Sequence, residues 1–358
     1  MAKSKLTLGL DIGSSSVKVV LLKEARRRGE EMHQLLAFGM KPLPPEAIVD
    51  GALMNSTAIV QAINELKEEL RIRRGTEAAI GVSGHSVIIK KISLPRMTQE
   101  ELDESIQWEA EQYIPFDVKD VNIDTFPLDS GNEATGQMDV LLVAAKKDMI
   151  NDYTSVVNEA GLAPAIVDVD AFAVQNCFES NYDLSRNETI VLINAGASVV
   201  NINIIANGGT TFTRDVTIGG NQFTEEIQKQ LNVSYDEAEA LKIGGGHSET
   251  DSVVPQEVER VLGTVAEQMA GEIQRSLDFY AATAADAHIA KVFLSGGTAK
   301  IPAVFKTIER RVGAPVEILN PFKKIAVDTR RFDPEYVMDV APMAAVAVGL
   351  GLRYVGDK

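Results

Sequence analysis

Short apolar segments alternate with amphipathic segments along the first 85 residues. Residues 5–13, 16–25 and 33–43 have the length and composition of strands and are separated by turn-forming residues. Residues 56–73 instead repeat apolar positions at the spacing of one helix face, and residues 76–84 are again strand-like. Strands that alternate with helices in this way predict an α/β lobe.

The order of the predicted elements changes between residues 86 and 164. It becomes β-α-β-β-α-β, with strands at residues 87–94, 121–128, 138–146 and 164–170 and helices at 98–116 and 148–161. This is the order of a split βαβ unit, which is a compact module. We therefore predict a subdomain of residues 86–164 inserted into a first lobe that comprises residues 1–85, 165–186 and 339–358.

The helix predicted at residues 98–116 carries two further signals. Thr98 and Glu101 have the spacing of a capping box. Trp108 lies near the apolar face, which favours a place in the core over contact with a partner peptide.

The second half repeats the design of the opening segment. Residues 189–216 give strand, glycine turn, strand and hairpin, and residues 291–313 give strand, double glycine and helix. Several helices are predicted between these two segments. We predict a second lobe of residues 187–338, with a helical subdomain at about 220–275.

Composition narrows the class of protein. The chain has 358 residues and a net charge of −16, which disfavours binding to nucleic acid or an anionic membrane through the whole surface. The single cysteine, Cys177, cannot form an internal disulfide, which favours the reducing cytoplasm. No apolar run reaches the length of a membrane span, so we expect membrane association only through a partner.

The turn "DIGSSSVK" is the first candidate for chemistry. Gly13 permits unusual backbone angles, and the amides and hydroxyls of Ser14 and Ser15 can surround an anion. Lys18 adds a positive charge, whereas Asp11 would repel a phosphate unless a cation such as Mg²⁺ lies between them. The alternative is a β-hairpin with a serine-rich turn.

The segment "LINAGASVVNI" is a near-copy of that turn. Asn194 stands where Asp11 stands, Gly196 matches Gly13, and Ala197 replaces a serine. Two such loops, one opening each half, predict a clamp on a phosphate chain, although two unrelated hairpins are the alternative.

Two shorter signals lie in the second half. Gly296 and Gly297 follow a strand and precede a helix, so a ligand can approach the backbone closely. Glu239 and Lys242 lie on one helix face, either as a surface ion pair or as hydrogen-bonding groups for a ribose and a base.

The order of these motifs resembles the actin-like ATPase superfamily, whose fold is bilobal and ribonuclease H-like. The resemblance spans nearly the whole chain. "IGGNQFTEEI" and "AEALK" are similar to the bacterial branch that contains the cell-division protein FtsA. "SLPRMTQEELDESIQWEAEQYIPF" and "DVDAFAVQN" are similar to the family of type IV pilus assembly proteins PilM.

The resemblance implies a cytoplasmic scaffold for pilus assembly and twitching motility that binds ATP between its lobes. It also implies docking of the N-terminal tail of the inner-membrane protein PilN in a groove between the first lobe and the inserted subdomain, together with other pilus assembly proteins. Peripheral attachment to the inner membrane would follow from that partner.

The resemblance also implies roles for individual residues. Asp11 would hold Mg²⁺ through water, and Asp11 and Asn194 are the catalytic candidates. The implied nucleotide-binding residues are Gly13, Ser14, Ser15 and Lys18 in the first loop, Gly196 and Ala197 in the second, and Gly219, Gly220, Glu239, Lys242, Gly296 and Gly297 around ribose and adenine.

One departure from the superfamily pattern affects the expected activity. The second loop carries Asn194 in place of an aspartate, and an amide cannot act as a base and binds Mg²⁺ less well. Asp170, between the halves, is a partial substitute or a structural residue. We therefore expect ATP binding with slow or absent hydrolysis.

Two other functions compete with the scaffold. A sugar-kinase-like phosphotransferase needs a base after the second loop, and "GASVVNINIIANGG" contains no Asp or Glu. An FtsA-like filament protein is the other alternative. FtsA ends in an amphipathic membrane helix, whereas this sequence ends on "GLRYVGDK".

Overall fold

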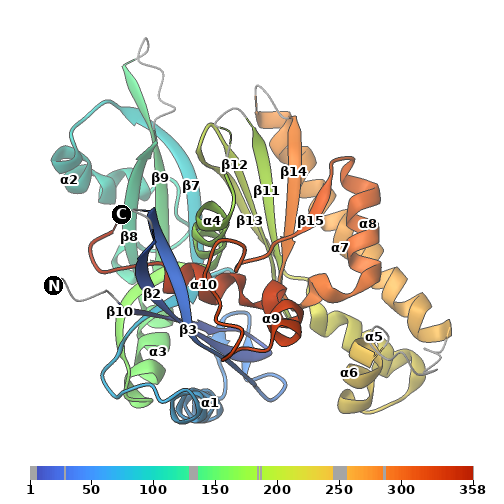
Figure 1. The fold of residues 1–358 in the computed structure, drawn as a ribbon. Coiled ribbons are helices and arrows are strands. Elements are labelled where there is room, and N and C mark those ends of the chain that lie inside the picture. Colours follow the sequence, from blue (N-terminus) through green and yellow to red (C-terminus); the bar gives the residue numbers. More distant parts are fainter. Residues whose placement is uncertain are drawn as a thin grey trace.

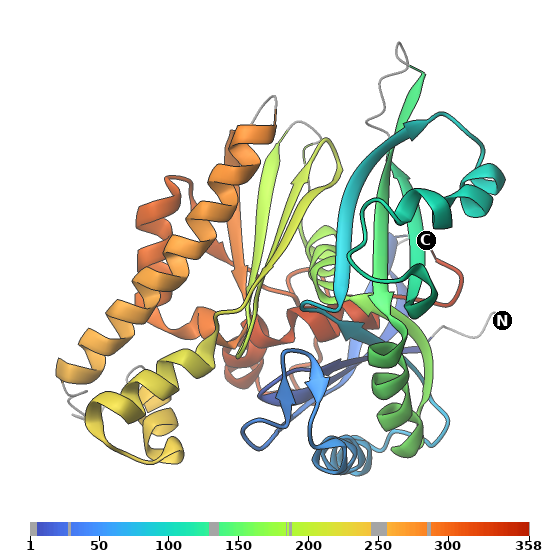
Figure 2. The same ribbon diagram turned by 180° about the vertical axis from the view of Figure 1, so that it is seen from behind.

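The structure is a computed structural model with two sheet-rich lobes (Figure 1). It describes residues 6–27, 30–128, 136–183, 185, 188–244, 256–284 and 288–357. A smaller subdomain projects beside the first lobe, and α5 (Gly220–Leu231) and α6 (Tyr235–Gly244) lie at the opposite corner of the molecule (Figures 1 and 2). The predicted bilobal α/β fold is confirmed.

The first lobe is built on a five-stranded sheet in the order β10-β6-β1-β2-β3. Its strands are β1 (Leu6–Ile12), β2 (Ser16–Arg27), β3 (Glu30–Pro42), β6 (Glu77–Val82) and β10 (Ala163–Val169). Strands β1 to β3 are antiparallel, whereas β6 and β10 run parallel to β1. One core lies beneath α1 (Ser56–Glu69) and α3 (Lys147–Glu159), next to the short hairpin β4 (Ile48–Val49) and β5 (Ala52–Leu53).

The second lobe repeats this topology. Its sheet has the order β13-β12-β11-β14-β15, with the first three strands antiparallel and the last two parallel to β11. The strands are β11 (Thr189–Ala195), β12 (Val200–Ala206), β13 (Gly209–Val216), β14 (Ile289–Ser295) and β15 (Val316–Ile318). The long helix α7 (Gln256–Thr283) and α8 (Pro302–Val312) pack on one face of this sheet. The internal repeat seen in the sequence is therefore a repeat of structure.

Two helices fill the space between the lobes. Helices α4 (Asp170–Asn181) and α10 (Ala345–Gly351) pack against each other and share a core with both sheets. A side chain at Gly349 would overlap the carbonyl of Ala173, so the small residues of α10 permit close contact between the two helices. The short helices α9 (Pro334–Val340) and η4 (Ala341–Ala344) contribute to this shared core, and η3 (Gly297–Lys300) contacts η4.

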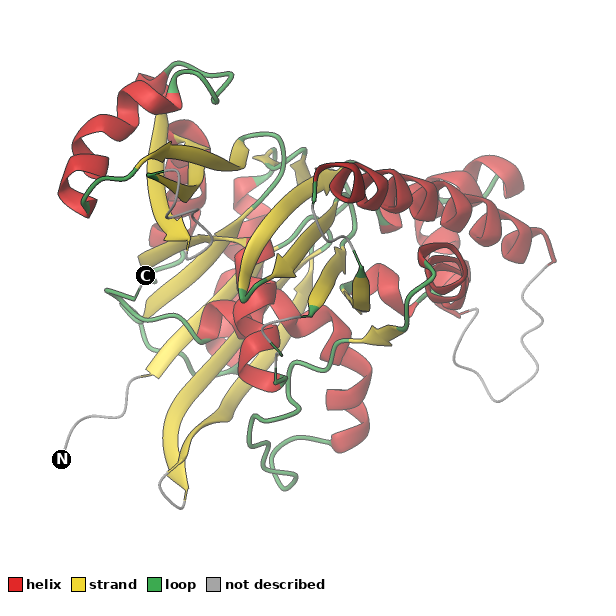
Figure 3. Cartoon of the chain, turned by 90° about the horizontal axis from the view of Figure 1, so that it is seen from above, coloured by secondary structure: helices red, strands yellow, loops and turns green. Residues whose placement is uncertain are grey.

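The inserted subdomain is smaller than the sequence predicts. Strands β7 (Val87–Pro95), β9 (Gln137–Lys146) and β8 (Val121–Leu128) form a three-stranded antiparallel sheet with α2 (Gln99–Ala110) and the turn η1 (Val118–Asp120). The predicted six-element module is wrong in its last two elements. Helix α3 packs in the core of the first lobe, and β10 pairs in parallel with β6. The reason is that α3 and β10 return the chain from the inserted sheet to the first lobe. Seen from above, the strands run through the middle of the molecule with helices around them (Figure 3).

Three other details test the sequence analysis. The capping box of Thr98 and Glu101 is present, and Cys177 is buried. The predicted place of Trp108 in the core is wrong, because its side chain is 75% exposed. The segment around Ala326, which we assigned to the second lobe, exchanges backbone hydrogen bonds with β3 of the first lobe.

Candidate functional site

The first loop is the turn between β1 and β2. Asp11 and Lys18 are cross-strand neighbours, and Lys18 Nζ donates to Asp11 Oδ2 at 3.0 Å. The amide of Gly13 donates to the Ser16 carbonyl and closes the turn. A Cβ at Gly13 would lie 3.4 Å from both Asp11 Oδ1 and Lys18 Nζ, so the glycine leaves the space beside this ion pair open. The two predicted charges are therefore present but neutralise each other.

A second carboxyl group lies beside the first loop. Asp170 begins α4, and the absence of a side chain at Gly81 on β6 makes room for its Oδ1. Burial and the charge of Asp11 raise the pKa of Asp170 to about 7, although the Ser83 hydroxyl donates a hydrogen bond to it. Burial and the charges of the same two carboxylates raise the pKa of Tyr153 as well. The environment of Asp170 therefore favours its protonated form.

The second loop is joined to the start of α5 and to η3. The carbonyl of Gly196 accepts hydrogen bonds from the Gly220 amide at 3.0 Å and from Thr298 Oγ1 at 2.7 Å. The carbonyl of Ala197 accepts a hydrogen bond from the Asn221 amide at 2.8 Å. Three segments that are far apart in the sequence therefore form one polar framework.

Two of the predicted glycines are required by this close contact. Gly296 has φ of +91°, and a Cβ there would overlap the carbonyl oxygen of Ala195. Gly219 has extended backbone, but a Cβ there would overlap the carbonyl of Ala197. Packing alone accounts for these two glycines, so their presence is not itself a sign of a ligand.

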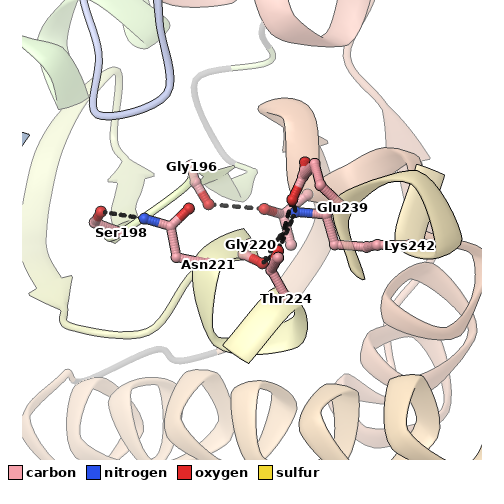
Figure 4. Close-up of polar contacts among 8 residues, drawn as sticks. Gly196, Ser198, Gly220, Asn221, Thr224, Glu239 and Lys242 are labelled. Carbon is pink, nitrogen blue, oxygen red and sulfur yellow. Dashed lines mark hydrogen bonds and ion pairs between the residues drawn. The ribbon is translucent and has the colours of Figure 1, made fainter. Parts of the chain in front are cut away.

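Glu239 and Lys242 are not a surface pair. Lys242 Nζ donates to Glu239 Oε2 at 2.6 Å, to Thr224 Oγ1 at 2.8 Å and to the carbonyl of Gly220 at 3.2 Å (Figure 4). Burial lowers the pKa of Lys242, although the hydrogen bond with Glu239 opposes this shift. Thr224, one helical turn after Gly220, is a member of this cluster that the sequence analysis missed.

Asn194 is held by two side chains. Its Oδ1 accepts a hydrogen bond from Ser295 Oγ at 3.3 Å, and its Nδ2 donates to Asn201 Oδ1 at 3.1 Å. Neither partner was predicted. The amide of Asn194 is therefore part of a defined network and not merely a weaker substitute for a carboxylate.

The groups from the two lobes meet around Asp170. Its carboxyl group interacts electrostatically with Asp11 and Lys18 of the first lobe and with Asp215 of the second. The predicted second-lobe residues that lie together are Gly196, Ala197, Gly219, Gly220, Glu239, Lys242, Gly296 and Gly297. Among the described residues, no group of three or more His, Cys, Asp or Glu side chains has the geometry of a metal site. One carboxylate with waters and phosphates is enough for Mg²⁺, so this finding is compatible with Asp11 as a water-mediated ligand.

Comparison with solved structures identifies the class of protein. The structure is similar to one described as the PilM-PilN type IV pilus biogenesis complex, with a TM-score of 0.85 and 28% identity over 98% of this chain and 99% of the other. The ethanolamine utilization protein EutJ from Carboxydothermus hydrogenoformans has a TM-score of 0.57 and 17% identity over 97% and 89% of the two chains. MreB5 of Spiroplasma citri bound to ADP has a TM-score of 0.52 and 13% identity over 96% and 94%. The fold is therefore that of the actin-like proteins.

Comparison of sequences identifies the family. The chain is 24% identical to the cell division protein FtsA of Bacillus subtilis over 75% of its own length and 64% of the relative, and 23% identical to FtsA of Enterococcus hirae over 90% and 79%. The sequence model of the protein family described as type IV pilus assembly protein PilM matches residues 9–355. The chain belongs to this family, so the resemblance inferred from its motifs is confirmed and the FtsA-like alternative is not favoured. In the part of the chain that the structure describes, no helix has the length and apolar composition needed to cross a membrane.

Proposed function

We propose that this protein is a cytoplasmic, ATP-binding scaffold that holds the N-terminal peptide of PilN in a groove between the first lobe and the inserted subdomain. The observation that carries the proposal is the likeness to a PilM-PilN complex, which extends over 98% of the chain and includes the inserted subdomain. Contact with PilN would place the protein at the inner membrane.

The two loops supply the groups that an ATP site needs. Ser14 and Ser15 beside Gly13 would donate to phosphate oxygens, and Lys18 would face the phosphates, while Asp11 would hold Mg²⁺ through water. The cluster of Lys242 and Glu239 would hydrogen-bond the ribose and the base. Bound Mg²⁺ would supply positive charge that offsets the phosphates.

Slow hydrolysis is part of the proposal. Asn194 cannot accept a proton, and its amide is already bonded to Asn201 and Ser295. Asp170, with a pKa of about 7, is the candidate base, because a group that titrates near the working pH can accept a proton from water. The raised pKa leaves less of the carboxylate form that can act as a base, which fits slow turnover.

Nucleotide binding tests the site directly. We expect calorimetry to show binding of ATP with Mg²⁺, and Lys242→Ala to weaken that binding roughly tenfold to a hundredfold, because a charged hydrogen-bond donor contributes about 1.5–3 kcal/mol. Lys306→Ala is the matched control, since Lys306 is exposed on α8, outside the candidate site. Absence of ATP binding in the wild-type protein would contradict the site. Fast turnover without PilN would contradict the scaffold.

Partner binding is tested separately. We expect a fluorescein-labelled N-terminal PilN peptide to bind the wild-type protein, with a scrambled peptide as the control. Anisotropy gives the affinity, and cross-linking from the bound peptide should label both the first lobe and the inserted subdomain. ATP-dependent light scattering with no peptide binding would instead favour an FtsA-like filament.

A further inference from the structure

A chain of hydrogen bonds leads from the second loop across to the first lobe. Asn194 Nδ2 donates to Asn201 Oδ1 at 3.1 Å, and Asn201 Nδ2 donates to Asp215 Oδ1 at 2.8 Å. Asp215 Oδ2 then accepts a hydrogen bond from the backbone amide of Gly84 at 2.7 Å. We call Asn194, Asn201 and Asp215 the relay. It connects the loop at the end of β11 with a segment of the other lobe.

The direction of these hydrogen bonds is fixed by chemistry. The Asp215 carboxylate can only accept, so Asn201 must offer it the NH₂ group and keep its oxygen for Asn194. The residue at position 194 must therefore donate. An aspartate there would place oxygen against oxygen, which explains why an amide fits the second loop in this fold.

The receiving segment is the turn of residues 83–86 between β6 and β7. Besides the contact of Gly84, the Ser83 hydroxyl donates to Asp170, and His85 Nε2 is 3.0 Å from Thr217 Oγ1. Gly84 is buried and has φ of +91°, so this turn has a specific backbone conformation. Strand β7 begins at Val87, so the relay ends where the inserted subdomain leaves the first lobe.

We infer that Asp215 is a positioning residue that couples the second loop to the orientation of the inserted subdomain, so that ATP and the PilN peptide strengthen each other's binding. The inference rests on the proposed function, because it requires both ligands. ATP would order the second loop, the relay would hold the turn of residues 83–86, and the turn would set one wall of the peptide groove. Such coupling is reciprocal, so each ligand must tighten the other by the same factor.

The relay can be broken at either end and restored by exchange. Asn194→Asp leaves an oxygen of Asn201 opposed to a carboxylate oxygen whichever way the Asn201 amide turns. Asp215→Asn removes the carboxylate that fixes the orientation of the Asn201 amide, so the hydrogen bond between Asn201 and Asn194 loses its set direction. In the double variant, the Asn201 amide can turn over, so that its NH₂ group donates to the aspartate at position 194 and its oxygen accepts a hydrogen bond from the asparagine at position 215. The side-chain oxygen at position 215 can still accept the hydrogen bond from the Gly84 amide. The double variant also keeps the total charge of the protein unchanged.

The experiment measures ATP affinity by calorimetry with and without saturating PilN peptide. The coupling ratio is the ATP affinity with peptide divided by the ATP affinity without it. We expect this ratio to be at least five in the wild-type protein and about one in each single variant. In the double variant it should return to the wild-type value. Asp183→Asn is the matched control for the loss of a carboxylate, because Asp183 is exposed and pairs with Lys324 away from the site. It should leave the ratio unchanged.

A second measurement needs no substitution. ATP alone should slow amide hydrogen exchange in residues 83–87 of the wild-type protein, and unchanged exchange there would overturn the inference. A coupling ratio of one with both ligands bound, or a single variant that keeps the wild-type ratio, would overturn it while the proposed function stands. Failure of both ligands to bind the folded wild-type protein would overturn both.

Discussion

Replacing Gly296 with alanine is expected to destabilise the protein by about 3 kcal/mol or more and to weaken ATP binding by more than tenfold. The added Cβ would overlap the carbonyl oxygen of Ala195 and lie 2.6 Å from its carbon, in a residue whose φ is +91°. The amide of Gly296 also donates to the Pro342 carbonyl at 2.7 Å, so the residue cannot move without breaking that bond. Urea denaturation and calorimetry give the two quantities.

Gly297→Ala is the neighbouring control. A Cβ at Gly297 would meet only the flexible side chain of Met343, at 3.7 Å, and the residue does not have a positive φ. We expect its free energy of unfolding to stay within about 0.5–1 kcal/mol of the wild type. Equal destabilisation by the two substitutions would contradict the packing argument for Gly296.

Local signals in the sequence predicted the loops well. A glycine between two apolar strands requires a tight turn, and the register of such a hairpin places Asp11 opposite Lys18. The second copy around Gly196 follows from the same pattern, and the two sheets have the same strand order. These features depend on neighbours along the chain, which is why the sequence alone reveals them.

The relay and its surroundings could not be predicted in the same way. Asn201 and Asn203 alternate with apolar residues along β12, a pattern typical of a strand with one face in water. Both are buried, at 4% and 1% exposure, because polar partners from α4 and β13 satisfy them. Gln175 comes from a helix 28 residues before Asn203, and the relay reaches Gly84, 131 residues before Asp215. Only the fold shows that these polar positions belong to a buried network.

The extent of the inserted subdomain was predicted incorrectly for a different reason. Element order predicted six elements in one module, but order alone does not say which sheet a strand joins. Strand β10 pairs with β6 because the first sheet has an open edge there, and α3 buries Tyr153 and Val157 in the core beneath it. Pairing of this kind depends on contacts between segments about 90 residues apart.

The stability of the ligand-free protein is expected to depend on the titration of Asp170. Its pKa is about 7 in the fold and 3.8 in the reference state, so the folded protein keeps a proton that the unfolded chain loses. Stability from this group is complete below about pH 4 and is lost as the pH rises through 7. Asp170→Asn removes this loss, so at pH 8 the variant should be more stable than the wild type by up to about 4 kcal/mol.

Urea denaturation of both proteins between pH 5 and pH 8 tests this expectation through the difference in their free energies of unfolding. The difference should grow as the pH rises and then level off above pH 7. In Asp183→Asn the difference should stay flat over the same range, because the ion pair with Lys324 lowers the pKa of Asp183. A flat difference for Asp170→Asn would mean that Asp170 is already ionised at pH 5. The carboxyl group would then not titrate near neutral pH, and this result would contradict the argument that assigns Asp170 as the candidate base for slow hydrolysis.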